Sequence, residues 1–218
     1  CSAQYHCSVL AGMAECAREK IPDLELMSEV IRHSASVGKR NVLWEIERLI
    51  ETRAEQDWPE DILEILKTLA LSYAEPMKEE GFEGLFSPSR EKTESLTLDT
   101  LRNGSINSIR GYALYTIAKL LKMHGELRPF FRETVQQASE DDCAAVWFMT
   151  PICVVQYTEE KSAFAESVFR LLIQRDVRAL GAIGGDALLW EFYPRDPMFC
   201  REQLLCACGS GISDLASQ

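Results

Sequence analysis

The stretch that decides the fold runs from residue 104 to residue 114 and reads GSINSIRGYAL. A small polar turn leads directly into the pair Ile109-Arg110, and apolar side chains then recur at the spacing of one helix face. These apolar residues are Ala113, Leu114, Ile117, Leu120 and Leu121. The pattern predicts a helix over about 105–123 that starts at the polar turn.

A weaker copy of this pattern follows about 37 residues later, a spacing typical of helical repeats. The rest of the chain also has a helical period, which predicts helices over about 5–18, 24–33, 42–51, 58–73, 126–138, 142–156, 159–174, 178–192 and 196–208. The later connections are short, and no alternating run of β-branched residues predicts a strand. We therefore predict an all-α fold, a right-handed α-α superhelix of antiparallel helical hairpins.

Residues 75–104 interrupt the helical pattern with Pro, Gly, Ser and Thr residues and an excess of acids. A stretch of this length between packed helices is either functional or mobile, and both interpretations stay open here. Leu85 and Phe86 suggest that part of it docks as a short helix. We expect N-terminal hairpins over 1–74, an acidic and partly ordered linker over 75–104, and repeats over 105–218, in one continuous solenoid.

The net charge of the chain indicates which classes of partner it can bind. The 218 residues include 23 Lys and Arg against 34 Asp and Glu, a net charge of −11, without a basic stripe. This balance argues against nucleic acid and anionic lipid, and no apolar run approaches the roughly 18 residues of a membrane span. Nothing resembles a signal peptide either. We expect a cytoplasmic chain, excised from a longer protein, with a protein as its partner.

The eight cysteines do not predict a metal site or a set of disulfides. Cys16, Cys143 and Cys153 fall in apolar helical segments, where a free cysteine behaves as a small hydrophobe. Cys206 and Cys208 lie on different sides of a helix, whereas zinc ligands come as pairs with two to four residues between them. We expect no catalytic residue, no cofactor and no metal. The alternative is a small helical enzyme that uses Glu, His or Cys in a pocket between helices.

The turn followed by Ile109-Arg110, together with the repeat spacing, resembles HEAT repeats. In that family the turn between two helices carries an Asp, and a Val-Arg pair opens the second helix. The resemblance implies that Arg110 lies beside Asp141 or Asp142 of the next unit. Such a ladder of Arg and Asp side chains would fix the register of neighbouring hairpins.

The pattern becomes degenerate further along the chain. Trp147 stands where the next unit should have its Arg. Residues 176–178, Asp-Val-Arg, are the residue types of the HEAT pattern, but they are adjacent instead of separated by several positions. Trp147, Trp190 and Tyr193 are our candidates for an interaction surface, because Trp and Tyr are enriched where proteins bind one another.

A narrower resemblance covers residues 98–218 and involves INSIRGYA at 106–113, LRPF at 127–130 and DD at 141–142. These segments are similar to the C-terminal helical region of large bacterial STAND-type NTPases. Such proteins couple an NTPase module to a helical-repeat sensor, often in anti-phage defence. The resemblance implies a bacterial sensor or scaffold part. The chain has no phosphate loop of the form Gly-x4-Gly-Lys-Ser/Thr, so we do not expect it to hydrolyse nucleotides.

Overall fold

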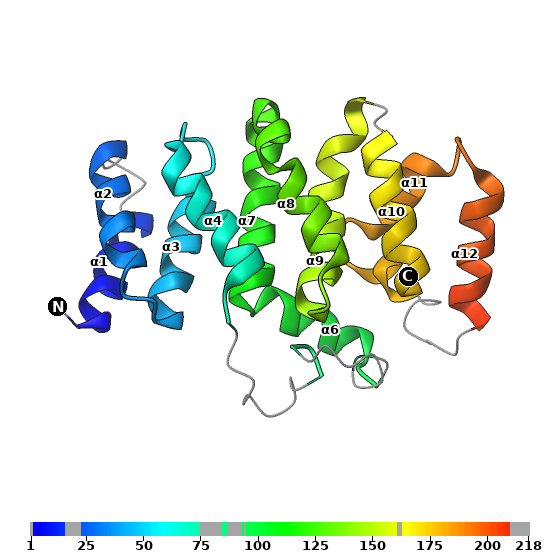
Figure 1. Ribbon diagram of the computed structural model, residues 1–218, viewed down its shortest axis with the longest axis horizontal. Helices are drawn as coiled ribbons and strands as arrows, with labels where there is room; N and C mark the ends of the chain where they lie inside the picture. The colour runs from blue at the N-terminus through cyan, green and yellow to red at the C-terminus, as the bar shows by residue number, and fades with distance from the viewer. Residues whose placement is uncertain are drawn as a thin grey trace.

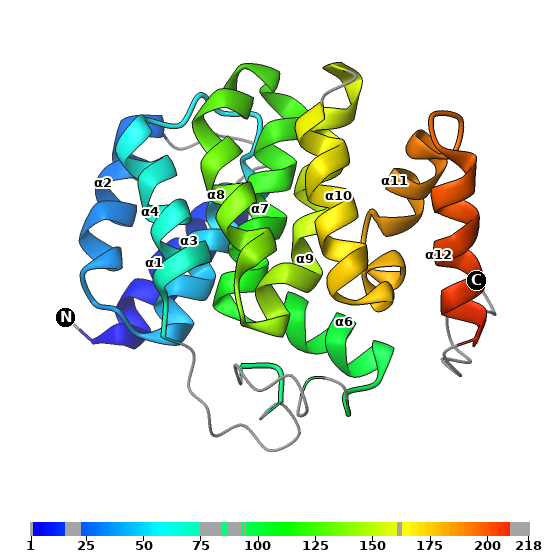
Figure 2. The same ribbon diagram turned by 45° about the vertical axis from the view of Figure 1, so that its right-hand side comes forward.

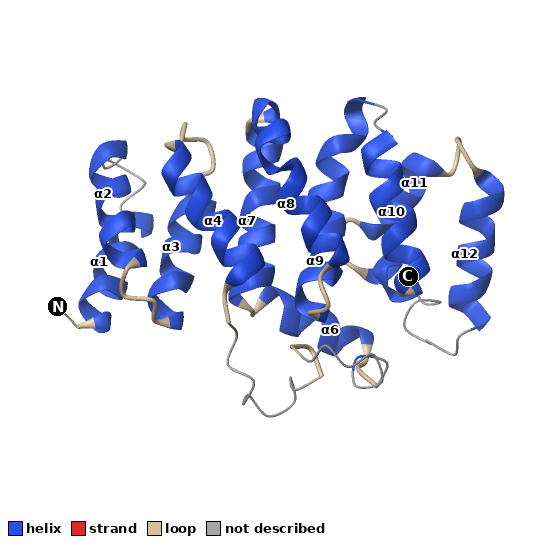
Figure 3. Cartoon of the chain, in the orientation of Figure 1, coloured by secondary structure: helices blue, strands red, loops and turns tan. Residues whose placement is uncertain are grey.

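The structure is a computed structural model that describes residues 2–15, 23–74, 84–86, 93, 95–160 and 163–209. Every regular element among these residues is a helix, and none of them forms a strand (Figure 3). The predicted all-α fold class is therefore confirmed. No helix in this part of the chain combines the length and the apolar character needed to cross a membrane.

The helices follow one another with mostly short connections. In chain order they are α1 (Ala3–Glu15), α2 (Leu24–Ala35), α3 (Arg40–Thr52), α4 (Glu60–Ser72), α6 (Leu98–Ile106), α7 (Ile109–Met123), α8 (Arg128–Glu140), α9 (Ala144–Val154), α10 (Ala163–Arg175), α11 (Gly185–Phe192) and α12 (Pro197–Gly209). Three short 3-10 helices, η2 (Gly125–Leu127), η3 (Val155–Glu160) and η4 (Val177–Gly181), lie between the later ones.

Eight of these α-helices build two layers that progress along the molecule in chain order (Figures 1 and 2). In one layer α1 packs against α3, α3 against α7, and α7 against α9. In the other layer α2 contacts α4, α4 contacts α8, and α8 contacts α10. The layers are joined because α4 also packs on α7 and α8 also packs on α9. Each helix thus buries its apolar face against its neighbours in the row.

The connections alternate between two edges of the molecule. The starts of α3, α7 and α9 lie at the lower edge of Figure 1, whereas the α3–α4 and α7–α8 connections lie at the upper edge. Residues that are far apart in the sequence therefore meet at each edge, where one connection lies beside the next.

The prediction of one helix over 105–123 is wrong at residues 107–108, where α6 has ended and α7 has not yet begun. The Ser108 Oγ accepts a hydrogen bond from the Gly111 amide (2.9 Å) and donates one to the Ser105 carbonyl (2.8 Å). Ser108 thereby caps α7 and holds the end of α6 against it. A β-carbon at residue 111 would lie 2.0 Å from the Ser105 carbonyl oxygen, so glycine permits this close approach.

Part of the segment predicted as a linker over 75–104 is ordered. α6 begins at Leu98, inside that segment. Leu85 is fully buried, and its carbonyl oxygen accepts hydrogen bonds from the Ala144 amide (2.9 Å) and the Cys143 thiol (3.4 Å). Docking of this part is confirmed, although residues 84–86 form a turn and not the short helix expected. Residues 75–83, 87–92 and 94 lie outside the described residues, as does Cys16.

Helix α9 is the centre of the core. It contacts α6, α7, α8, α10 and α11, and its sequence AAVWFMTPICV is apolar on all sides, as expected of a helix that is surrounded. Trp147 is only 1% exposed and packs edge-to-face on Phe148 at 5.8 Å. The assignment of Trp147 to an interaction surface is therefore wrong, because the helix that carries it is covered by neighbours.

Candidate functional site

The Arg110 side chain joins three segments at the lower edge. Its Nε donates to the Ala70 carbonyl (3.0 Å) and its Nη2 to the Leu71 carbonyl (2.9 Å), both at the end of α4. Its Nη1 donates to Asp141 Oδ1 (3.3 Å), and Nη2 forms an ion pair with Asp141 Oδ2. The two side chains are only 12% and 20% exposed. The guanidinium group therefore connects α4 and α7 to the α8–α9 connection.

Asp142 takes a different position from its neighbour. Its side chain is 78% exposed and lies 3.5 Å from the Arg175 guanidinium, at the end of α10. The structure thus brings Arg110 together with Asp141, while Asp142 faces another element. An exposed pair of this kind contributes little to stability, about 0–1 kcal/mol.

Arg178 forms a comparable junction at the start of η4. Its guanidinium pairs with Asp176 at 2.6 Å and donates to the carbonyl oxygens of Leu96 (2.6 Å) and Thr93 (3.1 Å). Asp176 also caps η4 by accepting the Arg178 amide at 2.9 Å. The Asp-Val-Arg stretch at 176–178 therefore contacts a segment about 80 residues earlier in the chain. Arg110 and Arg178 each bind backbone carbonyl oxygens as well as a carboxylate.

More than half of the exposed large apolar side chains among the described residues lie in or next to the last two helices. Of the ten such side chains among the described residues, six lie between residues 183 and 205. We call these six the C-terminal apolar surface: Ile183, Trp190, Tyr193, Met198, Leu204 and Leu205. A monomeric protein seldom gathers exposed apolar side chains in this way without a use for them.

The α11 part of this surface contains both remaining sequence candidates. Trp190 is 76% exposed and Tyr193 47% exposed, and helical spacing places both on one face with Asp186. The opposite face is anchored, because Phe192 is buried and stacks on Phe169 with ring centroids 5.2 Å apart. The two aromatic side chains are therefore presented to solvent by a helix whose other side is fixed in the core.

The sequence analysis missed an aromatic cluster at the α3–α7 contact. Trp44 stacks on Tyr112 at 4.5 Å, and Tyr112 lies 5.7 Å from Tyr115. Lys119 lies over the Tyr115 ring and pairs with Glu51. Burial raises the pKa of the Tyr112 hydroxyl, and the charges of Tyr115 and Glu47 add to the effect. Tyr112 and Tyr115 fall outside the apolar stripe of their helix, which was the signal available in the sequence.

A pocket of about 690 Å³ lies between α8 and α10. The described residues that line it include Arg132, Glu133 and Phe164, but neither a histidine nor a cysteine. The Arg132 guanidinium lies 4.7 Å from the Phe164 ring, which suits a packing contact. Glu133 is thus the one member of the Glu, His and Cys set of the enzyme alternative among these described lining residues.

The buried thiols serve packing. Burial raises the pKa of the Cys143, Cys153 and Cys200 thiols, which keeps them protonated and unreactive. The Cys153 Sγ donates to the Leu114 carbonyl at 3.1 Å across the α7–α9 contact. Burial of Cys143 and Cys153, predicted from their apolar neighbours, is confirmed, whereas Cys206 and Cys208 are exposed.

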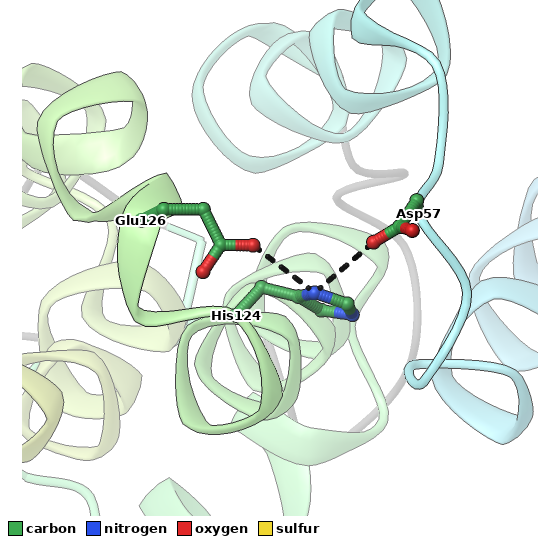
Figure 4. Close-up of side chains that lie close together, drawn as sticks. All are labelled: Asp57, His124 and Glu126. Atoms are coloured by element: carbon green, nitrogen blue, oxygen red, sulfur yellow. Dashed lines mark ion pairs between the residues drawn. The ribbon is translucent and has the colours of Figure 1, made fainter.

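One group of side chains could hold a metal ion. Among the described residues, Asp57, His124 and Glu126 have potential ligand atoms that all lie within 4.8 Å of one another (Figure 4). Asp57 comes from the α3–α4 connection, and His124 and Glu126 come from the α7–α8 connection. Sequence reasoning missed this group because its first two members are 67 positions apart.

Comparisons with protein-family models, with curated proteins and with solved structures gave no match. Function must therefore be argued from the residues and their geometry, since a helical fold by itself does not specify an activity.

Proposed function

We propose that this chain is a non-catalytic scaffold or sensor module, a HEAT-like α-α superhelix that binds a protein partner. The two-layer packing supports the superhelix, because each hairpin contacts the hairpins before and after it. A row of this kind offers extended faces for binding, and a few anchor side chains select the partner.

The observation that carries the proposal is the exposure of Trp190 within the C-terminal apolar surface. Tryptophan is enriched among the residues that dominate binding energy, and a 76% exposed indole leaves most of its apolar area available for burial. Tyr193 lies one turn away on the same face and offers a second ring together with a hydrogen-bonding hydroxyl. Both rings are attached to a helix that the core already holds in place, which lowers the entropic cost of binding.

Charged side chains lie beside the exposed apolar ones, and on α12 Arg201 shares a face with an acid. Asp186 precedes Trp190 by one turn, and Glu202 lies between Met198 and Leu205 on one face of α12. All six residues are exposed. The partner that fits is an amphipathic helix whose apolar face contacts the rings, with a Lys or Arg opposite Asp186 and charges that complement Arg201 and Glu202.

The enzyme alternative has less support. The described residues that line the pocket between α8 and α10 include Glu133 but neither a histidine nor a cysteine, and three of the described thiols are buried and protonated. The resemblance of residues 98–218 to the C-terminal region of STAND-type NTPases is compatible with a sensor role beside a separate NTPase module. Cytoplasmic location and a bacterial source belong to the same proposal.

The proposal is tested with W190A/Y193A, a variant that removes both rings without touching the core. We expect unchanged circular dichroism and an unchanged melting temperature, because both side chains are exposed. In cells of the source organism, photo-crosslinking from the surface of α11 should capture a partner with the native chain and lose it with the variant. The partner should then bind the native chain in purified form.

The matched control is M123A, which removes another exposed apolar side chain (57%) at the upper edge. This variant should retain the partner. Capture that is equal for W190A/Y193A and the native chain would contradict the proposed surface. Size-exclusion chromatography over a range of concentrations checks whether the occupant is instead a second copy of the chain, which would contradict a separate protein partner.

A further inference from the structure

The α3–α4 and α7–α8 connections lie next to each other at the upper edge (Figures 1 and 2). The first is fixed from within, because the buried Trp58 donates its indole N–H to the Arg53 carbonyl at 3.1 Å. The second is fixed by the short helix η2, which begins directly after His124. Asp57 and Glu126 thus extend from two rigid backbones that face each other.

The His124 ring is held in one orientation. Its side chain is 13% exposed, and its Nε2 lies 2.9 Å from the carbonyl oxygen of Ala54, in the α3–α4 connection. A carbonyl oxygen only accepts hydrogen bonds, so Nε2 must carry the proton and donate it. In the neutral ring Nδ1 then has a lone pair, and this atom faces the carboxylates of Asp57 and Glu126 (Figure 4). Histidines that bind metals typically donate their other ring N–H to a backbone carbonyl in this manner.

The two distances from the imidazole nitrogen match those of a tetrahedral metal site, and the two carboxylates have oxygens within 4.8 Å of each other. Nδ1 lies 3.5 Å from Asp57 Oδ1 and 3.3 Å from Glu126 Oε1. Bonds of about 2.0–2.2 Å from Zn²⁺ to nitrogen and oxygen, arranged tetrahedrally, separate neighbouring ligand atoms by about 3.3–3.6 Å. The exposed carboxylates (93% and 73%) can adjust their positions without disturbing the core.

The charges also favour a cation. Two carboxylates and one neutral imidazole give the group a charge of −2, which a divalent ion would balance. One nitrogen and two oxygen ligands suit a borderline ion such as Zn²⁺, whereas Mg²⁺ and Ca²⁺ prefer oxygen ligands alone. Water would complete the coordination at this open edge.

We propose that His124, Asp57 and Glu126 bind one divalent transition-metal ion, with Zn²⁺ as the probe that represents the class. The ion links the α3–α4 connection to the α7–α8 connection and so fixes two neighbouring hairpins relative to each other. This site lies apart from the C-terminal apolar surface and does not depend on the proposed partner.

The test is a calorimetric titration of the full chain with Zn²⁺. The background variant is C206S/C208S, because the two exposed thiols compete for zinc. We expect saturable binding of one equivalent and a rise in melting temperature with Zn²⁺ concentration. Binding should weaken as the pH falls, since a proton competes for Nδ1. With Co²⁺, the visible spectrum should show a tetrahedral site without thiolate charge-transfer bands.

Three variants locate the ion. H124Q should abolish binding, and E126Q should weaken it by about tenfold or more, with no change in fold expected from the exposed Glu126 side chain. E60Q is the control, because it removes one exposed negative charge close to Asp57 in the sequence but outside the group. Absence of saturable binding, or equal affinity in E126Q and E60Q, would overturn the proposal.

Discussion

The substitution Arg110→Ala tests the junction between α4, α7 and the α8–α9 connection most directly. It removes two hydrogen bonds to carbonyl oxygens and the paired contact with Asp141. The charged guanidinium is the donor in each of these contacts, and a hydrogen bond to a charged group contributes about 1.5–3 kcal/mol. With the Asp141 contact counted once, the three contacts would sum to about 4.5–9 kcal/mol in a dry interior.

The actual loss should be smaller because water can reach the site. Asp141 is 20% exposed and still accepts the Cys143 amide at 2.8 Å after the substitution. We therefore expect the free energy of unfolding to fall by about 2–3 kcal/mol. For a chain of this size, the melting temperature should fall by about 4–12 °C.

Urea unfolding followed by the helical circular dichroism signal measures this change. Arg110→Lys keeps the charge but loses the planar guanidinium group with its several N–H donors. We therefore expect its free energy of unfolding to lie between those of Arg110→Ala and the native chain. Arg201→Ala removes an exposed arginine of α12 and should change the free energy by less than about 0.5 kcal/mol.

A double-mutant cycle with Asp141→Asn isolates the pair itself, for which we expect a coupling of about 1–2 kcal/mol. Equal stabilities of the Arg110→Ala and Arg201→Ala variants would refute the reasoning. A coupling near zero would show that the ladder contact does not contribute.

Three further predictions follow from local geometry. Gly111→Ala should destabilise the chain by about 3 kcal/mol or more, because the added carbon would meet the last turn of α6, whereas Gly12→Ala has open space and should be neutral or slightly stabilising in thermal melts. The Arg170 guanidinium lowers the pKa of Asp196, so this pair stabilises the fold above pH 3.8, and the stabilisation is lost as the pH falls through the lower folded value. The stability difference between the native chain and Asp196→Asn should therefore shrink in acid, and a difference that stays constant down to pH 2 would argue against the pair. Exposed Cys206 should react with iodoacetamide in the native chain, and the buried thiols only after unfolding, as peptide mass spectrometry can show.

The sequence by itself determined the helices and some of their contacts. Helical hydrogen bonds join residues four positions apart, so the apolar period predicts a helix without knowledge of its surroundings. The stretch at 104–114 contains Ser108, which caps α7, and Gly111, which packs closely against the end of α6. The helical period did not predict the break between α6 and α7. The contact between Arg110 and Asp141 agrees with what the resemblance to HEAT repeats implied for these two residues.

The tertiary structure decided everything that depends on neighbours in the row. Trp147 and Trp190 are the same residue type in helical segments, yet one is 1% and the other 76% exposed. The difference arises because α9 is covered on all sides, while one face of α11 is left uncovered among the described residues. Asp57 and His124 meet only because two connections lie at the same edge. Burial and convergence are properties of the packed chain, and a local period does not contain them.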